Sequence, residues 1–225
     1  GSAIECIHAY SLIHDDLPCM DNDLTRRGKP ATHVKFGQST AVLAGNSLLT
    51  MAFEILSHKD LNVSEKIKIN LINKISESSG HLGIAGGQYL DLSYEHKRIS
   101  KKRIVEMEIK KTGKLFSFCC VAPLILKKMG KKEIKKFESI GADIGLLFQV
   151  ADDLIDLKSS SILAGKKTGK DKQKGKATLI SLLGYKNTII YANKLILQIN
   201  NKLKKYGPRV RKLSKTLDYI LNRKK

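Results

Sequence analysis

Proline, the strongest helix breaker, is almost absent from this chain. The four prolines are Pro18, Pro30, Pro123 and Pro208. Residues 31–122 and 124–207 are therefore long stretches in which helices can run without a proline break. Within them apolar residues recur at helical spacing, as in Ile67, Leu71 and Ile75, and alternating strand patterns with Asn-Gly or Asp-Gly turns are missing. The sequence therefore predicts an all-α protein.

About eight to ten helices are expected from the periodicity. Their expected spans are 2–17, 38–57, 63–79, 81–92, 101–111, 113–128, 132–157, 177–183, 186–205 and 209–223. Loops are expected at 25–32, at 165–176 and at Gly207-Pro208. The helices are rather apolar for surface elements, which favours a single large bundle over two small domains. We expect residues 1–225 to form one all-helical domain.

The charge balance narrows the classes of partner. The chain of 225 residues has 41 Lys and Arg against 21 Asp and Glu, a formal net charge of +20. Most of these cations are lysines spread along the chain, whereas planar recognition of bases and phosphates favours arginine, so a solvated lysine surface is expected rather than nucleic-acid binding. The four cysteines form no C-x-x-C pair. With no apolar run of membrane-spanning length and no visible signal peptide, we expect a cytoplasmic protein without stable membrane insertion.

Carboxylates gather in a first cluster, H-D-D-L-P-C-M-D-N-D, which contains Asp15, Asp16, Asp21 and Asp23. Pro18 should end or kink the helix here, which places Asp15 and Asp16 at a helix C-terminus. That end is unfavourable for anions because of the helix dipole, so an uncompensated acidic pair indicates a bound cation. The kink also allows Asp21 to return toward Asp15.

The second cluster is Q-V-A-D-D-L-I-D, with Asp152, Asp153 and Asp156 at i,i+4 and i,i+3 spacing on one helix face. The flanking residues are apolar, so the helix should be largely buried, and three like charges there are costly to desolvate. Mg²⁺ resolves both problems because it prefers oxygen ligands and bridges carboxylates to phosphates. The alternative is that each cluster is a solvated acidic patch.

Basic residues accompany both clusters. Arg26 and Arg27 follow the first, Lys111-Thr112 ends a helix before the second, and the loop after the second contains Lys166, Lys167, Lys170 and Lys176. Glycines in that loop permit close backbone approach to a phosphate, although no Walker A motif is present. The combination indicates a diphosphate held by Mg²⁺ in a central cavity lined by the two Asp-rich motifs, with the metal stabilising a departing diphosphate.

These motifs carry a family resemblance over almost the whole chain. They are the first Asp-rich motif followed by Arg26-Arg27-Gly28, then Gly86-Gly87-Gln88 with Asp91, Lys111-Thr112-Gly113, Phe148-Gln149 with the second Asp-rich motif, and the loop from Gly165 to Lys176. The chain resembles the trans-isoprenyl diphosphate synthase (polyprenyl synthetase) family, most closely its bacterial-type farnesyl diphosphate synthases. The resemblance implies an all-α isoprenoid synthase fold, a homodimer, and head-to-tail condensation of dimethylallyl or geranyl diphosphate with isopentenyl diphosphate.

The resemblance also assigns roles to individual residues. It implies that three Mg²⁺ ions are bound by Asp15, Asp16, Asp21, Asp152, Asp153 and Asp156. It implies catalytic roles for Asp15, Asp16, Lys111, Thr112, Gln149, Asp152 and Lys166. It implies substrate contacts for Arg26, Arg27, Lys111, Thr112, Gln149, Lys166 and Lys176, with Arg27 on the diphosphate of isopentenyl diphosphate.

Product length is expected to depend on Tyr10 and Ser11. Tyr10 lies five residues before Asp15, about 7.5 Å along a helix at 1.5 Å per residue. A large aromatic side chain there would form the floor of the pocket for the growing chain, which fits a C15 product. The alternative is that Tyr10 is a core aromatic residue without this role.

The chain departs from the family pattern at its beginning. Family members carry helices before this point that supply the rest of the isopentenyl diphosphate site, so residues 1–225 are expected to be an amino-terminally incomplete domain of doubtful activity alone. A terpene cyclase would share the fold, but Asp152, Asp153 and Asp156 favour elongation. The sequence also leaves open a geranylgeranyl or other chain-length synthase, a non-catalytic homologue that retains the fold, and a nucleic-acid-binding protein.

Overall fold

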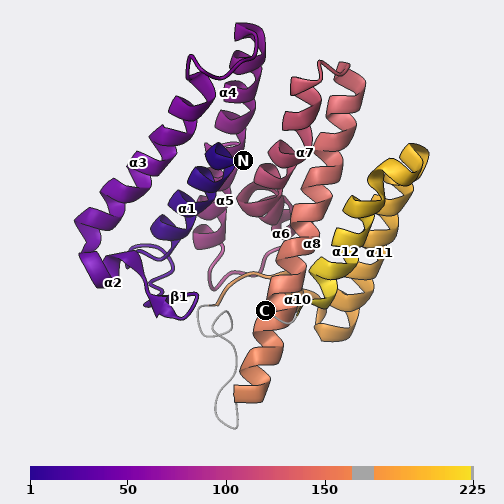
Figure 1. The fold of residues 1–225 in the computed structure, drawn as a ribbon. Helices are drawn as coiled ribbons and strands as arrows, with labels where there is room; N and C mark the ends of the chain where they lie inside the picture. Colours follow the sequence, from indigo (N-terminus) through magenta and orange to yellow (C-terminus); the bar gives the residue numbers. More distant parts are fainter. Residues whose placement is uncertain (164–174, 224–225) are drawn as a thin grey trace.

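The computed structural model describes residues 1–163 and 175–223, and the prediction of an all-α fold is confirmed there (Figure 1). The helices are α1 (Ser2–Asp15), α2 (Thr32–Phe36), α3 (Gln38–Ser57), α4 (Glu65–Ser79), α5 (Ile84–Ser93), α6 (Lys101–Glu108), α7 (Lys114–Leu126), α8 (Lys131–Leu163), α10 (Leu179–Leu183), α11 (Tyr185–Leu203) and α12 (Arg211–Asn222). A π-helical turn, Ile109–Gly113, joins α6 to α7, and a 3₁₀ segment, Lys204–Val210, precedes α12.

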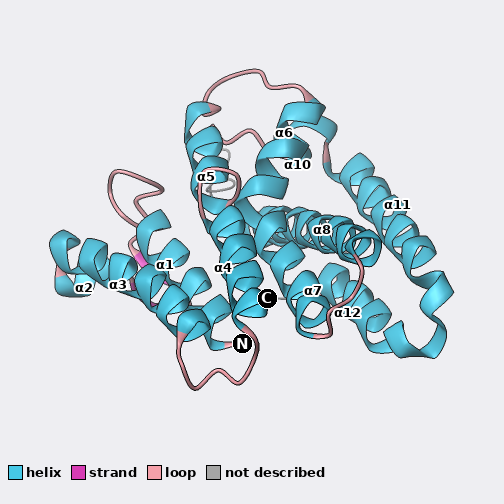
Figure 2. Ribbon diagram, turned by 90° about the horizontal axis from the view of Figure 1, so that it is seen from above, coloured by secondary structure: helices cyan, strands magenta, loops and turns pink. Residues whose placement is uncertain are grey.

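The bundle is organised around α8. Viewed from above, α1, α3 and α4 lie on one side of the α7–α8 pair, and α11 and α12 lie on the other (Figure 2). One apolar cluster joins α6, α8, α10, α11 and α12 around fully buried residues such as Leu147 and Ile199. A second cluster joins α1, α4 and α7 around residues such as Ile7 and Ile75. The long apolar stretches of the sequence are thus the core faces of helices in one bundle.

Glycines set the close approach of backbones beside the middle of α8. A Cβ built on Gly145 would lie 2.5 Å from the Cα of Gly113, and one on Gly141 would lie 2.5 Å from the Cα of Ser117. Such contacts exclude any side chain at the two α8 positions. A Cβ on Gly87 of α5 would lie 2.2 Å from the backbone nitrogen of Lys111. The π-helical turn is therefore packed between α5 and α8 by backbone contact.

The segment 25–32, expected as a loop, contains a small antiparallel ribbon. Strand β1 (Thr25–Arg26) pairs with β2 (Lys29–Pro30), and Arg27 and Gly28 at the turn have φ values of 53° and 76°. Two successive residues with positive φ are typical of the tight turns that close hairpins. The expectation that strands are absent is wrong for these four residues. A glycine at only one of the two turn positions gives a weak sequence signal for such a turn.

Helix α3 has an unusual surface. Among the described residues it is the one helix that is long and apolar enough to cross a membrane by length and composition alone, and 17% of its most apolar stretch is buried. Its inner face packs on α1, and a Cβ built on Gly45 would lie 2.1 Å from the His14 ring. On its outer face Leu43 and Met51 are 65% and 45% exposed. An apolar surface of this kind is suited to contact with another apolar surface.

Candidate active site

The first Asp-rich motif lies where α1 ends. Asp15 is the last residue of α1, Asp16 is its C-cap, and Pro18 follows the helix end as predicted. The chain then turns back, and the backbone N–H of Asp21 donates a hydrogen bond of 2.8 Å to the carbonyl oxygen of Asp15. The predicted return of Asp21 toward Asp15 is therefore confirmed.

The second Asp-rich motif faces the first across a cavity of about 360 Å³. Its lining is Leu12, Asp15, Asp21, Asp23, Arg26, Asp91, Met107, Glu108, Lys111, Gln149, Asp152, Asp153, Asp156, Lys176 and Thr178. The volume is in the range of small-molecule sites. The prediction of a central cavity lined by both motifs is confirmed, and the carboxylates of α1 and α8 are brought together from 130 or more residues apart in the sequence.

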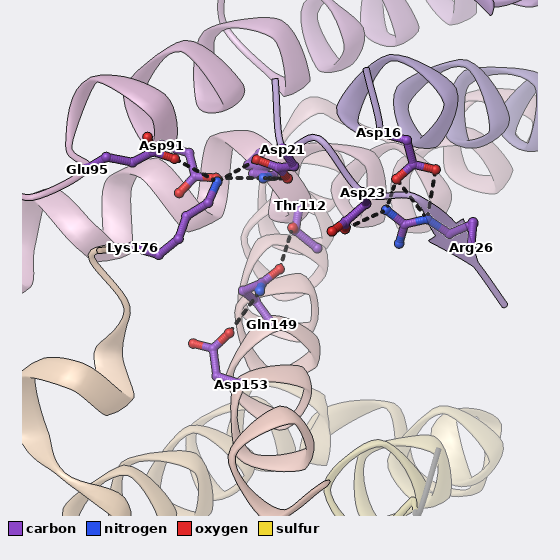
Figure 3. Close-up of polar contacts among 11 residues, drawn as sticks. Asp16, Asp21, Asp23, Arg26, Asp91, Glu95, Thr112, Gln149, Asp153 and Lys176 are labelled. Carbon is purple, nitrogen blue, oxygen red and sulfur yellow. Dashed lines mark hydrogen bonds and ion pairs between the residues drawn. The ribbon is translucent and has the colours of Figure 1, made fainter. Parts of the chain in front are cut away.

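Two lysines cross-link carboxylates on one side of the cavity. The Nζ of Lys176 lies 2.7 Å from both Asp21 Oδ1 and Asp91 Oδ2, and 3.5 Å from Glu95 Oε1 (Figure 3). The Nζ of Lys111 lies 2.7 Å from Asp91 Oδ2 and 3.9 Å from Asp21 Oδ2. Burial raises the pKa of Asp91, but the two lysines outweigh it and hold this pKa below its ordinary value. Asp91 therefore anchors both lysine ammonium groups at the cavity wall.

The charge of Asp15 is poorly compensated in this arrangement. Burial raises the pKa of Asp15 to about 6, Lys111 and Arg26 act to lower it, and Asp21 and Asp91 raise it further. Burial lowers the pKa of Lys111, but Asp15, Asp91 and Asp21 raise it by more. The lysine is therefore fully charged, whereas the carboxylate would gain from an added cation.

A hydrogen-bonded chain of side chains runs from the π-helical turn to the second motif (Figure 3). The hydroxyl of Thr112, on the π-helical turn, donates to Gln149 Oε1 at 3.1 Å. The amide of Gln149 donates to Asp153 Oδ1 at 3.0 Å. This chain fixes the orientation of the Gln149 amide and of a buried Asp153 carboxylate.

The two arginines after the first motif have different environments. The guanidinium of Arg26 is bonded to both carboxylate oxygens of Asp16, with Nε 3.1 and 3.2 Å from them, and lies 3.7 Å from Asp23 Oδ2 (Figure 3). Arg26 lines the cavity. Arg27 is exposed at the turn of the β1–β2 ribbon and is not among the described lining residues. The structure therefore brings Arg26 to the cavity lining but not Arg27.

Besides Arg27, four predicted residues in the described part of the chain are not among the lining residues: Asp16, Thr112, Tyr10 and Ser11. Tyr10 of α1 is buried in the apolar cluster that joins α1, α4 and α7. Its hydroxyl donates to the carbonyl oxygen of Ser79 at 3.2 Å, and its ring packs edge-on against His14. Ser11, also on α1, donates to the carbonyl oxygen of His8. Lys166 lies outside the residues that the structure describes.

Glu108 and Arg223 are among the residues that line or contact the site although the sequence did not single them out. Glu108, the last residue of α6, lines the cavity. Arg223, just after α12, pairs with Asp152 and packs 3.9 Å from the centre of the Phe148 ring. Neither belongs to a recognisable motif, and Arg223 is 71 residues from its carboxylate partner. Only the tertiary structure shows these contacts.

The donor set fits Mg²⁺ on chemical grounds. All the motif carboxylates offer oxygen, which hard divalent ions prefer, and the charge of Asp15 is disfavoured without a cation. Among the described residues no three His, Cys, Asp or Glu side chains already converge as a ready-made ligand group. Water and phosphate oxygens would therefore complete the coordination, as they commonly do for Mg²⁺.

Known proteins resemble this chain over its whole length. The polyprenyl synthetase family profile matches residues 1–217. The farnesyl diphosphate synthases of Micrococcus luteus and Escherichia coli (strain K12) are each 40% identical to it over 100% of this chain and 77% of their own length. A geranyltransferase structure from Helicobacter pylori, complexed with magnesium and isoprenyl diphosphate, has a TM-score of 0.83 and 36% identity over 98% of this chain and 72% of its own. The chain belongs to the polyprenyl synthetase family and is a prenyltransferase.

Proposed function

We propose that this prenyltransferase condenses dimethylallyl or geranyl diphosphate with isopentenyl diphosphate to give farnesyl diphosphate. The observation that carries the proposal is one cavity in which both Asp-rich motifs meet Lys111, Lys176 and Arg26. Farnesyl diphosphate synthases among the relatives support the C15 product. An Arabidopsis thaliana geranylgeranyl pyrophosphate synthase, 39% identical over 98% of this chain and 60% of its own length, keeps a C20 product as the alternative.

The metal sites in this proposal use the two motifs. Asp15, Asp16 and Asp21 would hold Mg²⁺ on the α1 side, and Asp152, Asp153 and Asp156 on the α8 side, with three ions in all. Bound Mg²⁺ supplies Lewis-acid stabilisation of the diphosphate leaving group. Asp16 would have to exchange its contact with Arg26, since both of its oxygens are bonded to that guanidinium.

The cations of the cavity would act on the allylic diphosphate. Lys111 and Lys176 have Nζ groups at the same wall, and with Arg26 they would donate to the diphosphate oxygens as the allylic C–O bond breaks. Positive charge placed where negative charge develops lowers the barrier to ionisation. Lys166 would join them, and Arg27 would hold the diphosphate of isopentenyl diphosphate.

The carbon chemistry then needs a polar, oriented wall beside the allylic carbon. Thr112 and Gln149, held together at 3.1 Å, would supply it. The isopentenyl double bond attacks the allylic carbon as the diphosphate departs, one carbon–carbon bond forms, and a proton is lost to restore the double bond. The chain of Thr112, Gln149 and Asp153 keeps the amide dipole in one orientation during these steps.

The chain-length role of Tyr10 is part of the proposal. Its ring is buried on α1 with Ser11 beside it, on the helix that ends at Asp15. Replacement Tyr10→Ala removes a large aromatic side chain and should shift products toward C20 or longer. Chromatography of the dephosphorylated products measures this shift. A Tyr10→Ala enzyme whose products still end at C15 would refute it.

A direct assay separates the proposed function from the competing ones. The protein is incubated with geranyl diphosphate and Mg²⁺, with and without isopentenyl diphosphate, and the products are identified by mass spectrometry. A farnesyl product that requires both substrates supports the proposal. Hydrocarbon or alcohol products from the allylic substrate alone indicate a cyclase. Binding of Mg²⁺ and diphosphate without turnover indicates a non-catalytic homologue.

We also propose that the enzyme is a cytoplasmic homodimer. The exposed apolar face of α3, with Leu43 65% exposed, supports a contact with a second copy, and four free cysteines suit a reducing compartment. Light scattering after gel filtration should give twice the chain mass. Leu43→Glu should shift the protein toward monomer, whereas Leu197→Glu, at a 63% exposed position on α11, should not. Equal masses for all three proteins at the monomer value would contradict the dimer.

A further inference from the structure

Glu108 is a buried acid whose carboxylate oxygens have no hydrogen-bond partner of normal geometry among the described residues. It ends α6 immediately before the π-helical turn, and 3% of its surface is exposed. Neither carboxylate oxygen has a hydrogen-bond partner in the described part of the chain. The backbone N–H of Leu179 favours the charged form, but its geometry falls short of a hydrogen bond. A buried carboxyl group without hydrogen-bond partners is costly, so a cation or a hydrogen-bond donor from beyond the described residues would stabilise it.

The surroundings of Glu108 indicate the sign of the charge that would stabilise it. Glu108 lines the same cavity as the carboxylates of Asp91 and Asp153. The two lysines that line the same cavity, Lys111 and Lys176, both donate to Asp91 at 2.7 Å. Glu108 therefore shares its side of the cavity with a second-motif carboxylate, and a cation entering there would relieve the repulsion between them.

The geometry also indicates how Glu108 would meet such a cation. Gln149 orients Asp153 by a hydrogen bond of 3.0 Å to Oδ1. No group of three acidic or histidine side chains in the described residues is placed to ligate one ion together. Mg²⁺ retains several water ligands, and carboxylates beyond the direct ligands commonly accept hydrogen bonds from such groups and fix their orientation.

We propose that Glu108 is a positioning residue for the metal at the second Asp-rich motif, accepting hydrogen bonds from water ligands of Mg²⁺ held by Asp152 and Asp153. This inference rests on the proposed function, because that function places Mg²⁺ at the second motif. Glu108 does not touch the substrate in this arrangement. It orders the hydration shell of the ion, so its loss should weaken metal binding without removing an ion.

Metal binding tests the inference directly. Mg²⁺ is titrated calorimetrically into the protein in the presence of inorganic diphosphate, for the wild type, Glu108→Gln and Glu108→Asp. Because loss of an outer carboxylate typically weakens metal binding by about 10- to 100-fold, Glu108→Gln should show a loss of this size with unchanged stoichiometry. Glu108→Asp keeps the charge and should recover part of the affinity. Glu106→Gln, at an exposed position on the same helix, is the matched control and should bind like the wild type.

The outcomes separate this inference from the proposed function. If Glu108→Gln binds Mg²⁺ with the affinity of the wild type, the inference about Glu108 is overturned. The proposed prenyltransferase function is then unaffected, because the wild type still binds Mg²⁺ with diphosphate. A stoichiometry lower by one ion overturns the water-mediated role in favour of direct ligation. If metal-free Glu108→Gln has a lower Tm than the wild type but the same affinity for Mg²⁺, Glu108 has only a structural role and the inference is overturned. A wild type that binds no Mg²⁺ with diphosphate and forms no prenyl product removes both the function and the inference.

Discussion

The cost of the Asp15 charge gives a prediction that needs no substrate. Replacement Asp15→Asn keeps the shape of the side chain at the end of α1 and removes its ionisation. In the metal-free protein the pKa of Asp15 is raised from 3.8 to about 6, chiefly by burial. The folded state therefore holds the proton more tightly than the unfolded state does.

The magnitude follows from linkage between protonation and folding. A rise of about 2 pKa units, at about 1.36 kcal/mol each, corresponds to about 3 kcal/mol of unfolding free energy. Above pH 6 the residue is charged in both states and the full cost applies. Below about pH 4 it is neutral in both, and the cost disappears. Since Asp15 is partly exposed, this value is an upper bound.

The measurement is unfolding in EDTA between pH 4 and pH 8. At pH 8 Asp15→Asn should be more stable than the wild type by up to about 3 kcal/mol, roughly 6–12 °C in Tm for a chain of this size. The difference should shrink as the pH falls from 6 to 4. Asp218→Asn, at an exposed position on α12, is the control and should show no such difference. Added Mg²⁺ and inorganic diphosphate should reverse the order, because the wild type keeps the ligand.

Two results would refute this reasoning. One is a difference in unfolding free energy between Asp15→Asn and the wild type that is the same at pH 5 and pH 8. Such a difference would not arise from ionisation of Asp15. The other is a metal-free wild type more stable than Asp15→Asn at pH 8, which would mean that Lys111 and Arg26 compensate the charge. Either would remove the electrostatic argument for a cation beside Asp15.

Two further predictions concern the supports of the site. Gly87→Ala places a Cβ 2.2 Å from the backbone nitrogen of Lys111, so the replacement should displace the π-helical turn. We expect it to lower the free energy of unfolding in urea by about 1–3 kcal/mol and to lower kcat. A Gly87→Ala variant that is as stable and active as the wild type would contradict this packing. Arg223→Met removes the ion pair to Asp152, which competes with Mg²⁺ for that carboxylate. Because partly exposed ion pairs contribute about 0.2–1 kcal/mol, the affinity for Mg²⁺ in the presence of inorganic diphosphate should rise by up to about fivefold, as measured by calorimetry. Weaker Mg²⁺ binding in Arg223→Met would show that Arg223 supports the metal site instead of competing with the ion.

The carboxylates of the site were predictable because their environment is local. Pro18 ends α1 within three residues of Asp15, and the apolar positions around Asp152 and Asp153 belong to the same helix. Spacing of three and four residues along a helix fixes which side chains share a face, whatever surrounds it. For the same reason most of the expected helices match the observed ones to within a few residues, including Gln38–Ser57 at both ends.

The remaining features depend on contacts between distant segments. The segment 101–111 was expected as one regular helix, but α6 ends at Glu108 and a π-helical turn follows. Nothing in the local sequence opposes an α-helix there; the backbones of Gly87 and Gly145 lie against the turn from two other helices. The ion pairs of Asp91 with Lys176 and of Asp152 with Arg223 join residues 85 and 71 positions apart. The hydrophobic periodicity of a sequence does not indicate which distant residues form ion pairs.

The same distinction explains why the sequence indicates a site residue at Asp153 but not at Glu108. In the sequence Glu108 is one acid among lysines and glutamates of α6, a helix with exposed neighbours at Lys102 and Glu106, and it resembles a solvated side chain. The π-helical turn after it helps set how α6 meets α8, and Glu108 then lines the cavity beside Asp153. When a charged residue is buried although its sequence neighbours predict exposure, the tertiary structure has determined its environment. Such conflicts between local sequence and structure are expected mainly at functional sites. That conflict is the reason to test Glu108 before any other residue outside the motifs.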